Sequence, residues 1–294
     1  MRVPRVVQVA AVQAAPVILD VDASVDKAIT LLGEAAALGA ELAVLPECFL
    51  SFYPEGHWGQ ADEVWDRFYE SSVEVPGPHV DRLIEACRRL DMHMVIGVNE
   101  REPARSGSVY NSMLTLGPDG LLLRHRKLMP TYHERSWHAF GNGSDLEVVA
   151  APFARIGGLI CWENRMPLAR YAVYQGHPEI WAAPTADGGD GWHSLMSAIA
   201  IESGAFVVMA MKFQPHSAYP ADFPIALPEE EFLTGSAIFE PEEGHVIAGP
   251  ITGEEGIVIA ELDLKVAARE KRWFDVAGHY SREDVLLPRL MAPR

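Results

Sequence analysis

The sequence predicts an α/β fold, because short apolar segments that suit strands alternate along the chain with amphipathic segments that suit helices. Two further observations support a layered globular protein. Of its 294 residues, 49% are hydrophobic and 22% are charged, so the chain can bury a large core. No low-complexity tract or Gly/Ser-rich linker divides it. We therefore expect one large domain or two closely packed halves.

In the first half of the chain, apolar residues at helical spacing predict a helix at 22–39, which Gly39 ends. The segment 117–120, GPDG, is a turn signal, so the apolar runs on either side of it form a hairpin. The expected elements are a strand at 6–12, a helix at 22–39, a strand at 41–45, an irregular aromatic-rich stretch at 49–65, a helix at 79–90, a strand at 92–98 and hairpin strands at 109–116 and 121–125.

The second half continues the alternation. Its expected elements are a strand at 156–161, a helix at 167–175, a strand at 180–183, a helix at 195–203 and a strand at 206–211. A helix, a glycine, a short apolar strand and a proline occur in that order in both halves, so two halves could pack their sheets face to face. Two prolines and three successive glutamates make 222–231 a surface loop, and 281–294 is expected to be a packed or draped extension.

Charge and composition exclude several classes of partner. Forty-one acidic residues against 24 basic ones give a net charge of −17, which repels phosphate backbones and anionic membranes, so we expect no nucleic-acid partner. Gln8 and Gln13 interrupt the apolar N-terminal stretch, and no run approaches the ~18 apolar residues of a membrane span. We expect a cytoplasmic protein without membrane contact. Three cysteines outside any CxxC spacing, and no HExxH motif, predict neither a disulfide framework nor a metal site.

Three ionisable side chains stand where predicted strands end: Glu47, Lys127 and Cys161. The ends of buried strands are where α/β folds collect reactive groups. A thiol attacks well only as a thiolate, which needs a base and a cation beside it, and Glu47 and Lys127 can fill those two roles. Each residue also has a plainer interpretation: Cys161 as a small buried hydrophobe, Glu47 as a cap or solvated turn, and Lys127 as part of a basic surface strip.

These residues lie in segments that resemble the nitrilase superfamily of carbon-nitrogen hydrolases over nearly the whole chain. The segments are Pro46-Glu47, HRKLMPT at 125–131 and CWE at 161–163. Three further segments, CWENRMPLARYAVYQG, APTADG and GHYSREDVLLP, look like the nitrilase branch itself. The resemblance implies an α-β-β-α sandwich as a single domain over 1–280, a short C-terminal extension over 281–294, and no cofactor or metal.

The resemblance also implies a mechanism. Glu47 acts as the base, Cys161 attacks a nitrile, and a thioimidate and then an acyl-thioester lead to the carboxylic acid and ammonia. Lys127 and the backbone N–H of Trp162 stabilise the charged intermediates, and Glu134, which matches a second family glutamate, positions Lys127. Two alternatives remain: an amidase or carbamoyl-amide hydrolase with the same triad, which the Trp-Glu pair after the cysteine disfavours, and a catalytically silent binding module.

Five residues are candidates for substrate binding, each with a structural alternative such as core packing, a polar loop position or a helix cap. They are Tyr53, Trp137, His138, Trp162 and Thr185. The sequence departs from the family here, since Trp137 follows Glu134 at the third position, where many relatives have tryptophan at the fourth. The helices after Cys161 and after Trp192 match the segments that pair subunits in the family, which implies a homodimer or larger homo-oligomer acting on a small-molecule nitrile.

Overall fold

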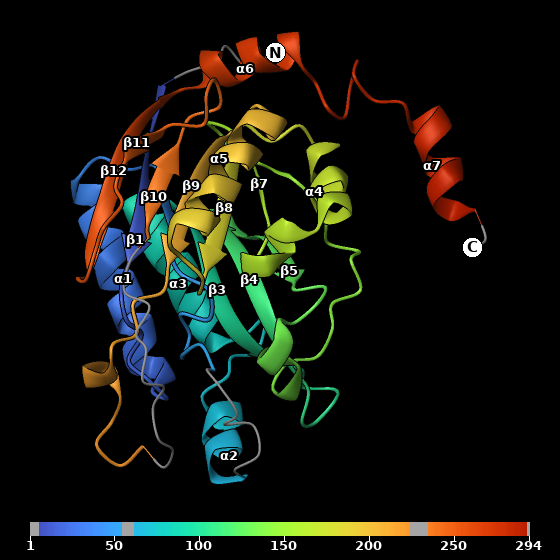
Figure 1. Ribbon diagram of the computed structural model, residues 1–294. Coiled ribbons are helices and arrows are strands. Elements are labelled where there is room, and N and C mark those ends of the chain that lie inside the picture. The colour runs from blue at the N-terminus through green and yellow to red at the C-terminus, as the bar shows by residue number, and fades with distance from the viewer. Residues whose placement is uncertain (1–5, 55–61, 224–234, 293–294) are drawn as a thin grey trace.

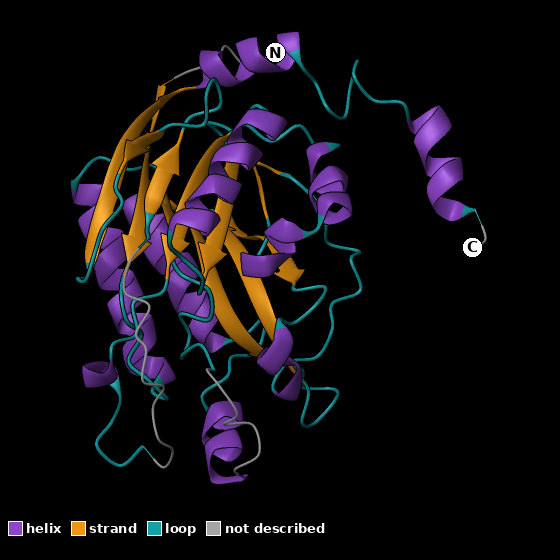
Figure 2. Ribbon diagram, in the orientation of Figure 1, coloured by secondary structure: helices purple, strands orange, loops and turns teal. Residues whose placement is uncertain are grey.

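Two six-stranded sheets form the centre of the computed structural model, which describes residues 6–54, 62–223 and 235–292 (Figures 1 and 2). The strand order of the first sheet is β12-β1-β2-β3-β4-β5, and that of the second is β11-β10-β9-β8-β7-β6. The first sheet contains β1 (Val6–Gln13), β2 (Leu42–Val44), β3 (His93–Arg101), β4 (Val109–Gly117), β5 (Gly120–Arg126) and β12 (Gly256–Asp263). The second contains β6 (Val149–Ala150), β7 (Arg155–Gly158), β8 (Ile180–Thr185), β9 (Phe206–Met211), β10 (Ala237–Phe239) and β11 (Val246–Ala248).

The described helices lie mainly outside the two sheets (Figure 2). They are α1 (Val21–Ala37), α2 (Asp62–Glu70), α3 (Pro78–Leu90), α4 (Pro167–Tyr174), α5 (Asp190–Ser203), α6 (Leu264–Trp273) and α7 (Glu283–Met291), with 3₁₀ turns η2 (Tyr132–Ser136), η3 (Cys161–Arg165) and η4 (His216–Ala218). Local chemistry sets the ends of several: the Asp20 carboxylate caps α1 by accepting from Ala23 N at 2.9 Å, and proline begins α3 and α4. No helix in the described part of the chain is long and apolar enough to cross a bilayer.

Alternation along the strands builds three apolar layers. In β1, Val7 and Val9 face the second sheet, whereas Ala10 and Val12 face α1 and α3. Trp181 of β8 belongs to a third layer, where α4 and α5 cover the outer face of the second sheet. The sheets thus pack face to face between two pairs of helices, which is the expected α-β-β-α sandwich.

One strand pairing joins segments that lie near opposite ends of the sequence. β12 pairs antiparallel with β1 over eight residues, from Val6 opposite Asp263 to Gln13 opposite Gly256. The C-terminal half therefore contributes an edge strand to the sheet built by the N-terminal half. Sequence periodicity did not predict β10, β11, β12 or α6, because the first two strands are only three residues long and the pairing partner of β12 is about 250 residues away.

Other expectations need correction. The strand expected at 156–161 ends at Gly158, and Cys161 instead begins η3 with a left-handed φ of 45°. The stretch at 49–65, expected to be irregular, includes the start of α2 at Asp62. In the tail, α7 buries none of its residues, but its first residue, Glu283, accepts hydrogen bonds from Tyr171 of α4 at 3.0 Å and from Gln175 at 2.8 Å, so the start of the extension contacts the body. Of the loop expected at 222–231, residues 224–231 lie outside the described part.

Gly97 of β3 allows a close backbone approach that fixes the segment after β2. Its N–H donates to Pro46 O at 3.1 Å, and a Cβ on Gly97 would lie 2.5 Å from both Glu47 Cα and Cys48 N. Backbone on both sides must therefore move if any side chain is added here. The segment that carries Glu47 thus depends on a glycine in the neighbouring strand.

We predict that Gly97→Ala lowers the free energy of unfolding by ~1–3 kcal/mol or more, because overpacking forces the backbone apart. Gly33→Ala in α1 is the control: nothing lies within 4 Å of its added methyl group, and alanine favours the helix by up to ~1 kcal/mol. Urea unfolding of both variants measures the difference. Equal stability of the two variants would show that the contact with Glu47 is not tight.

Candidate active site

Cys161 lies at the carboxyl end of the parallel strands β7 and β8. Two residues link it to the end of β7, and its side chain is buried, with 2% exposure. Thr185, the last residue of β8, donates its hydroxyl to Cys161 Sγ at 3.4 Å. The left-handed φ of Cys161 is uncommon for a residue with a side chain, and such outliers cluster at functional sites.

Lys127 follows β5 directly and holds two carboxylates together. Its Nζ lies 2.7 Å from Glu47 Oε1 and 2.8 and 2.9 Å from the two carboxylate oxygens of Glu134. The three side chains are completely buried. Asn111 Nδ2 donates to Glu47 Oε1 at 2.7 Å, and the Tyr53 hydroxyl donates to Glu134 Oε1 at 2.7 Å. We call Glu47, Lys127 and Glu134 the buried charge cluster.

The two carboxylates in the buried charge cluster differ in their affinity for a proton. Burial opposes ionisation of Glu134, but the charge of Lys127 outweighs it and lowers the pKa of this carboxyl to about 2. At Glu47, burial dominates over the attraction of Lys127, and Glu134 adds repulsion, so the pKa is raised above its usual value. For Lys127, the two carboxylates outweigh burial and raise the pKa of the ammonium. Lys127 and Glu134 therefore form a lasting ion pair, and Glu47 is the better base.

The remaining oxygen of Glu47 is available to take a proton. Its Oε2 is buried and has no hydrogen-bond partner among the residues that the structure describes. A buried polar atom of this kind requires an explanation, because most such atoms are paired. The Cys161 thiol interacts electrostatically with Glu47, Lys127 and Glu134, and its pKa is raised by burial and by Glu47, against the effect of Lys127. The raised pKa favours the neutral thiol form of Cys161 over the thiolate.

The five residues predicted to bind substrate lie in different surroundings. Tyr53 and Thr185 contact Glu134 and Cys161, as described above. Trp137 points elsewhere: it packs on Phe52 and Phe68 at ring distances of 6.5 and 5.0 Å, which is core packing. A contact between Trp137 and substrate stays a prediction.

His138 and Trp162 differ from the structural alternatives considered for them, whereas their contact with substrate stays a prediction. His138 is buried rather than an ordinary polar loop residue, and its Nε2 lies 2.9 Å from Asn99 Oδ1. Trp162 is 43% exposed, so the alternative of a buried structural tryptophan is wrong. Its indole N–H donates to Asp187 Oδ2 at 2.8 Å, and the Arg165 guanidinium lies 4.5 Å from its ring centroid.

The sequence of this chain resembles those of known enzymes. The sequence profile of the family described as "Carbon-nitrogen hydrolase" matches residues 8–272. The chain belongs to the carbon-nitrogen hydrolase family. A bifunctional nitrilase/nitrile hydratase of Nicotiana tabacum, NIT4B, is 40% identical over 298 residues, which cover 95% of this chain and 84% of that protein. The aliphatic nitrilase of Sinorhizobium fredii (strain HH103) is 39% identical over 288 residues, covering 94% of this chain and 92% of that protein.

Within the family the chain falls in the nitrilase branch, and it is a hydrolase acting on carbon–nitrogen bonds. A solved structure gives the same fold: Nit3 of Saccharomyces cerevisiae, described as a member of branch 10 of the nitrilase superfamily, matches with a TM-score of 0.76. The match covers 95% of this chain and 97% of that one at 21% sequence identity, so it bears on the fold alone.

Sequence reasoning missed two residues of this carbon-nitrogen hydrolase site. Asn111 is a polar residue inside the apolar strand β4, a signal that could have singled it out. Lys212 directly follows β9 and is buried, with its Nζ 5.6 Å from the centroid of the Tyr53 ring. Burial lowers the pKa of Lys212 to about 8. It stands at a strand end, as Glu47, Lys127 and Cys161 do, so the same rule would have found it.

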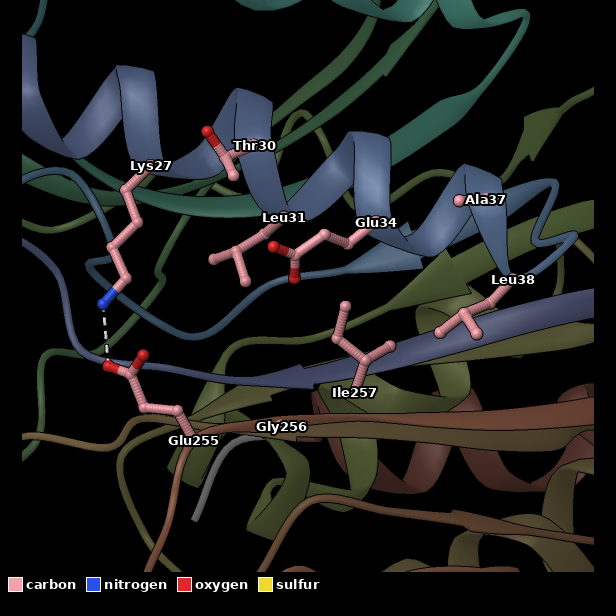
Figure 3. Close-up of a pocket in the computed structure, with 9 residues that line it drawn as sticks. All are labelled: Lys27, Thr30, Leu31, Glu34, Ala37, Leu38, Glu255, Gly256 and Ile257. Carbon is pink, nitrogen blue, oxygen red and sulfur yellow. Dashed lines mark hydrogen bonds and ion pairs between the residues drawn. The ribbon is translucent and has the colours of Figure 1, made fainter.

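Two of the surface hollows outside the buried charge cluster differ in their relation to the predicted site. One is bordered by Trp162 and includes Met129, Tyr132, Arg135 and Arg165. The other lies between α1 and the start of β12, where Lys27 pairs with Glu255 at 2.7 Å and Leu31 faces Ile257 (Figure 3). The second contains none of the predicted site residues. Among residues 6–54, 62–223 and 235–292, no group of three or more His, Cys, Asp or Glu is placed to hold a metal ion.

We predict that His138 makes stability depend on pH. Burial lowers the pKa of this imidazole to about 4, below its ordinary 6.5, because the apolar surroundings oppose the charge more than Glu134 favours it. Between pH 6.5 and 4 this histidine binds a proton in the unfolded chain but not in the folded chain. The free energy of unfolding therefore falls as pH falls through this window. The loss between pH 7 and pH 5 is roughly 1–2 kcal/mol.

Urea unfolding at pH 7 and pH 5 measures this effect, and His138→Gln should remove the corresponding part of the slope. His245→Gln, at a residue whose side chain is 72% exposed, should leave the slope unchanged. A wild-type slope in His138→Gln would mean that folding does not change the pKa of this histidine.

Proposed function

We propose that this nitrilase-branch hydrolase converts an organic nitrile to the carboxylic acid and ammonia through a covalent bond to Cys161. The observation that carries the proposal is the free Oε2 of Glu47 in a buried cluster with Lys127, beside a thiol of raised pKa. That combination supplies a base, a cation and a nucleophile without a metal or cofactor. The names of the relatives, a nitrilase/nitrile hydratase and an aliphatic nitrilase, support a nitrile as substrate.

In the first step, Glu47 removes the thiol proton while Sγ of Cys161 attacks the nitrile carbon. The carbon–nitrogen triple bond becomes a double bond, the carbon–sulfur bond forms, and the proton passes from Glu47 to nitrogen to give a thioimidate. Lys127 stabilises the negative charge that develops on nitrogen, and it does so without solvent reorganisation because Glu47 and Glu134 already hold it in place.

Two waters complete the reaction. Glu47 takes a proton from the first water as the water adds to the thioimidate carbon. The nitrogen is then protonated and departs as ammonia, and the enzyme is left as an acyl-thioester. The second water, activated in the same way, releases the carboxylic acid and restores the thiol. Trp162 lies in the first turn of η3, where backbone N–H groups have no acceptor within the helix, so its N–H can bind the oxyanion of each tetrahedral intermediate.

The other predicted residues take supporting roles in this proposal. Glu134 fixes Lys127 and keeps its charge, and Tyr53 fixes Glu134 through the 2.7 Å hydrogen bond. Thr185 orients the Cys161 thiol, and His138 lies next to Glu134. Trp162 borders the hollow that includes Met129 and Tyr132, whereas Trp137 supports the fold of this region.

Assembly and compartment extend the proposal. We expect a homodimer or larger homo-oligomer in the cytoplasm, built from one catalytic domain over 1–280 and an extension over 281–294. Exposed apolar side chains on α4 and α7 support association, since a monomer leaves few such groups in contact with water. They are Leu168, Val285, Leu286, Leu287, Leu290 and Met291.

Release of an amide from the nitrile is a second outcome that the same residues can produce. One relative is named for both nitrilase and nitrile hydratase activity, and a hydratase releases an amide. Both products arise from one tetrahedral carbon: expulsion of ammonia leads to the acid, and expulsion of the thiolate leads to the amide. The balance depends on whether positive charge is held near the departing nitrogen, which Glu47 and Lys127 determine.

Cys161→Ala should fold and lose essentially all turnover, because the change removes the nucleophile and adds little strain. Cys87→Ala is the matched control, since Cys87 is equally buried but lies in the core between α3 and the first sheet. Ammonia release from a panel of small nitriles measures turnover. Activity in Cys161→Ala would end the proposal of a cysteine nucleophile.

Product analysis distinguishes nitrile from amide hydrolysis. We expect the carboxylic acid as the main product of nitriles, a minor amide fraction, and little hydrolysis of the amide with the same R group. Chromatography of parallel reactions with matched nitriles and amides measures this. Faster turnover of the amide than of every nitrile in the panel would instead establish the amidase reading.

A further inference from the structure

Glu163, the glutamate after Cys161-Trp162, is completely buried yet belongs to neither the charge cluster nor the surface hollows. Its Oε2 accepts a hydrogen bond from Ile160 N at 2.9 Å, and its Oε1 accepts one from Leu128 N at 2.6 Å. Ile160 immediately precedes Cys161, and Leu128 immediately follows Lys127. A single carboxylate therefore joins the backbone next to the cysteine to the backbone next to the lysine.

His125 connects this carboxylate to a second one. Its Nε2 lies 3.0 Å from Glu163 Oε2, and its Nδ1 lies 2.9 Å from Asp145 Oδ1. Burial opposes the charge on the ring, but Glu163 and Asp145 outweigh it and raise the pKa of His125 to about 10. Both ring nitrogens therefore donate, one to each carboxylate, as an imidazolium between two anions requires.

Asp145 completes the arrangement on the other side of Lys127. Its Oδ2 accepts from Arg126 N at 2.9 Å, so the backbone N–H groups before and after Lys127 are each bound by a carboxylate of this network. The lysine's own N–H donates to Asn111 O at 2.8 Å. Three successive N–H groups are thus fixed, and the same network fixes the residue before Cys161.

We propose that Glu163, held by His125 and Asp145, is a positioning residue that sets the placement of the Cys161 thiol relative to the Lys127 ammonium. Glu163 touches no reacting atom; it acts through Ile160 and Leu128. This rests on the proposed nucleophilic role of Cys161. A carboxylate is needed because three N–H donors converge on its two oxygens, and a glutamine would direct an N–H toward one of them.

Glu163→Gln should lower kcat by about 10²-fold, as expected when a preorganised group is misplaced, with KM changed less than about threefold. The rate at which iodoacetamide alkylates Cys161, corrected with Cys161→Ala, should also change, because the thiol is no longer held beside Glu47 and Lys127. Both are measured where circular dichroism shows the variant to be folded.

Glu100→Gln is the matched control for lost stability. Glu100 is a buried glutamate of β3 that binds the Arg124 and Arg126 side chains and the Ser112 hydroxyl but no backbone of the site. The Glu100→Gln variant should be less stable than the wild type, and its kcat should stay within about threefold of the wild-type value. Equal losses of kcat in Glu163→Gln and Glu100→Gln, or a loss below threefold in Glu163→Gln, would overturn the positioning role.

Asp145→Asn provides a second test if Glu163→Gln does not fold. It leaves Glu163 in place and removes only the outer anion, so kcat should fall by about fivefold or more at unchanged KM; a change below twofold overturns the proposal. The outcome for the proposed function is separate. Turnover by Cys161→Ala would refute the nucleophile itself, whereas an inactive Cys161→Ala beside a fully active Glu163→Gln would refute positioning alone.

Discussion

The Lys127 ammonium lies fully buried between the carboxylates of Glu47 and Glu134, and the rest of the site is arranged around this contact. Removing such charges from water costs several kcal/mol per ion, and only close geometry with added hydrogen bonds offsets the cost. Asn111 and Tyr53 supply those added bonds, one to each carboxylate. The cluster holds two anions for one cation, so one carboxyl keeps its affinity for a proton, and that carboxyl is Glu47.

The two sheets deliver these groups from opposite sides of the central core. Glu47 follows β2 and Lys127 follows β5 in the first sheet, whereas Cys161 follows β7 and Thr185 ends β8 in the second. The proposed nucleophile from one sheet thus meets the proposed base and cation from the other, and the site forms only when the two sheets are packed together. Stability of the apolar layer and geometry of the site are therefore coupled.

Close backbone contacts give this arrangement its precision. Gly97 lets the segment carrying Glu47 lie directly on β3, and Glu163 ties the turn at Cys161 to the backbone after Lys127. Both devices act on main-chain atoms, which move less than long side chains. The left-handed φ of Cys161 belongs to the same region, at the start of η3 two residues after the end of β7.

Local sequence determined the alternation of strands and helices, the hairpin at β4 and β5, and the reactive side chains at strand ends, because periodicity, turn residues and strand length act over a few neighbouring positions. Glu47, Lys127 and Cys161 could be singled out on that basis, with family motifs adding Glu134. Only the tertiary structure decided that β12 pairs with β1, that Trp137 packs into the core on Phe52 and Phe68, and that Trp162 is exposed. It also placed Glu163 against the backbone of Leu128, 35 residues earlier in the sequence. Such contacts depend on register and packing between distant segments, on which local patterns carry no information.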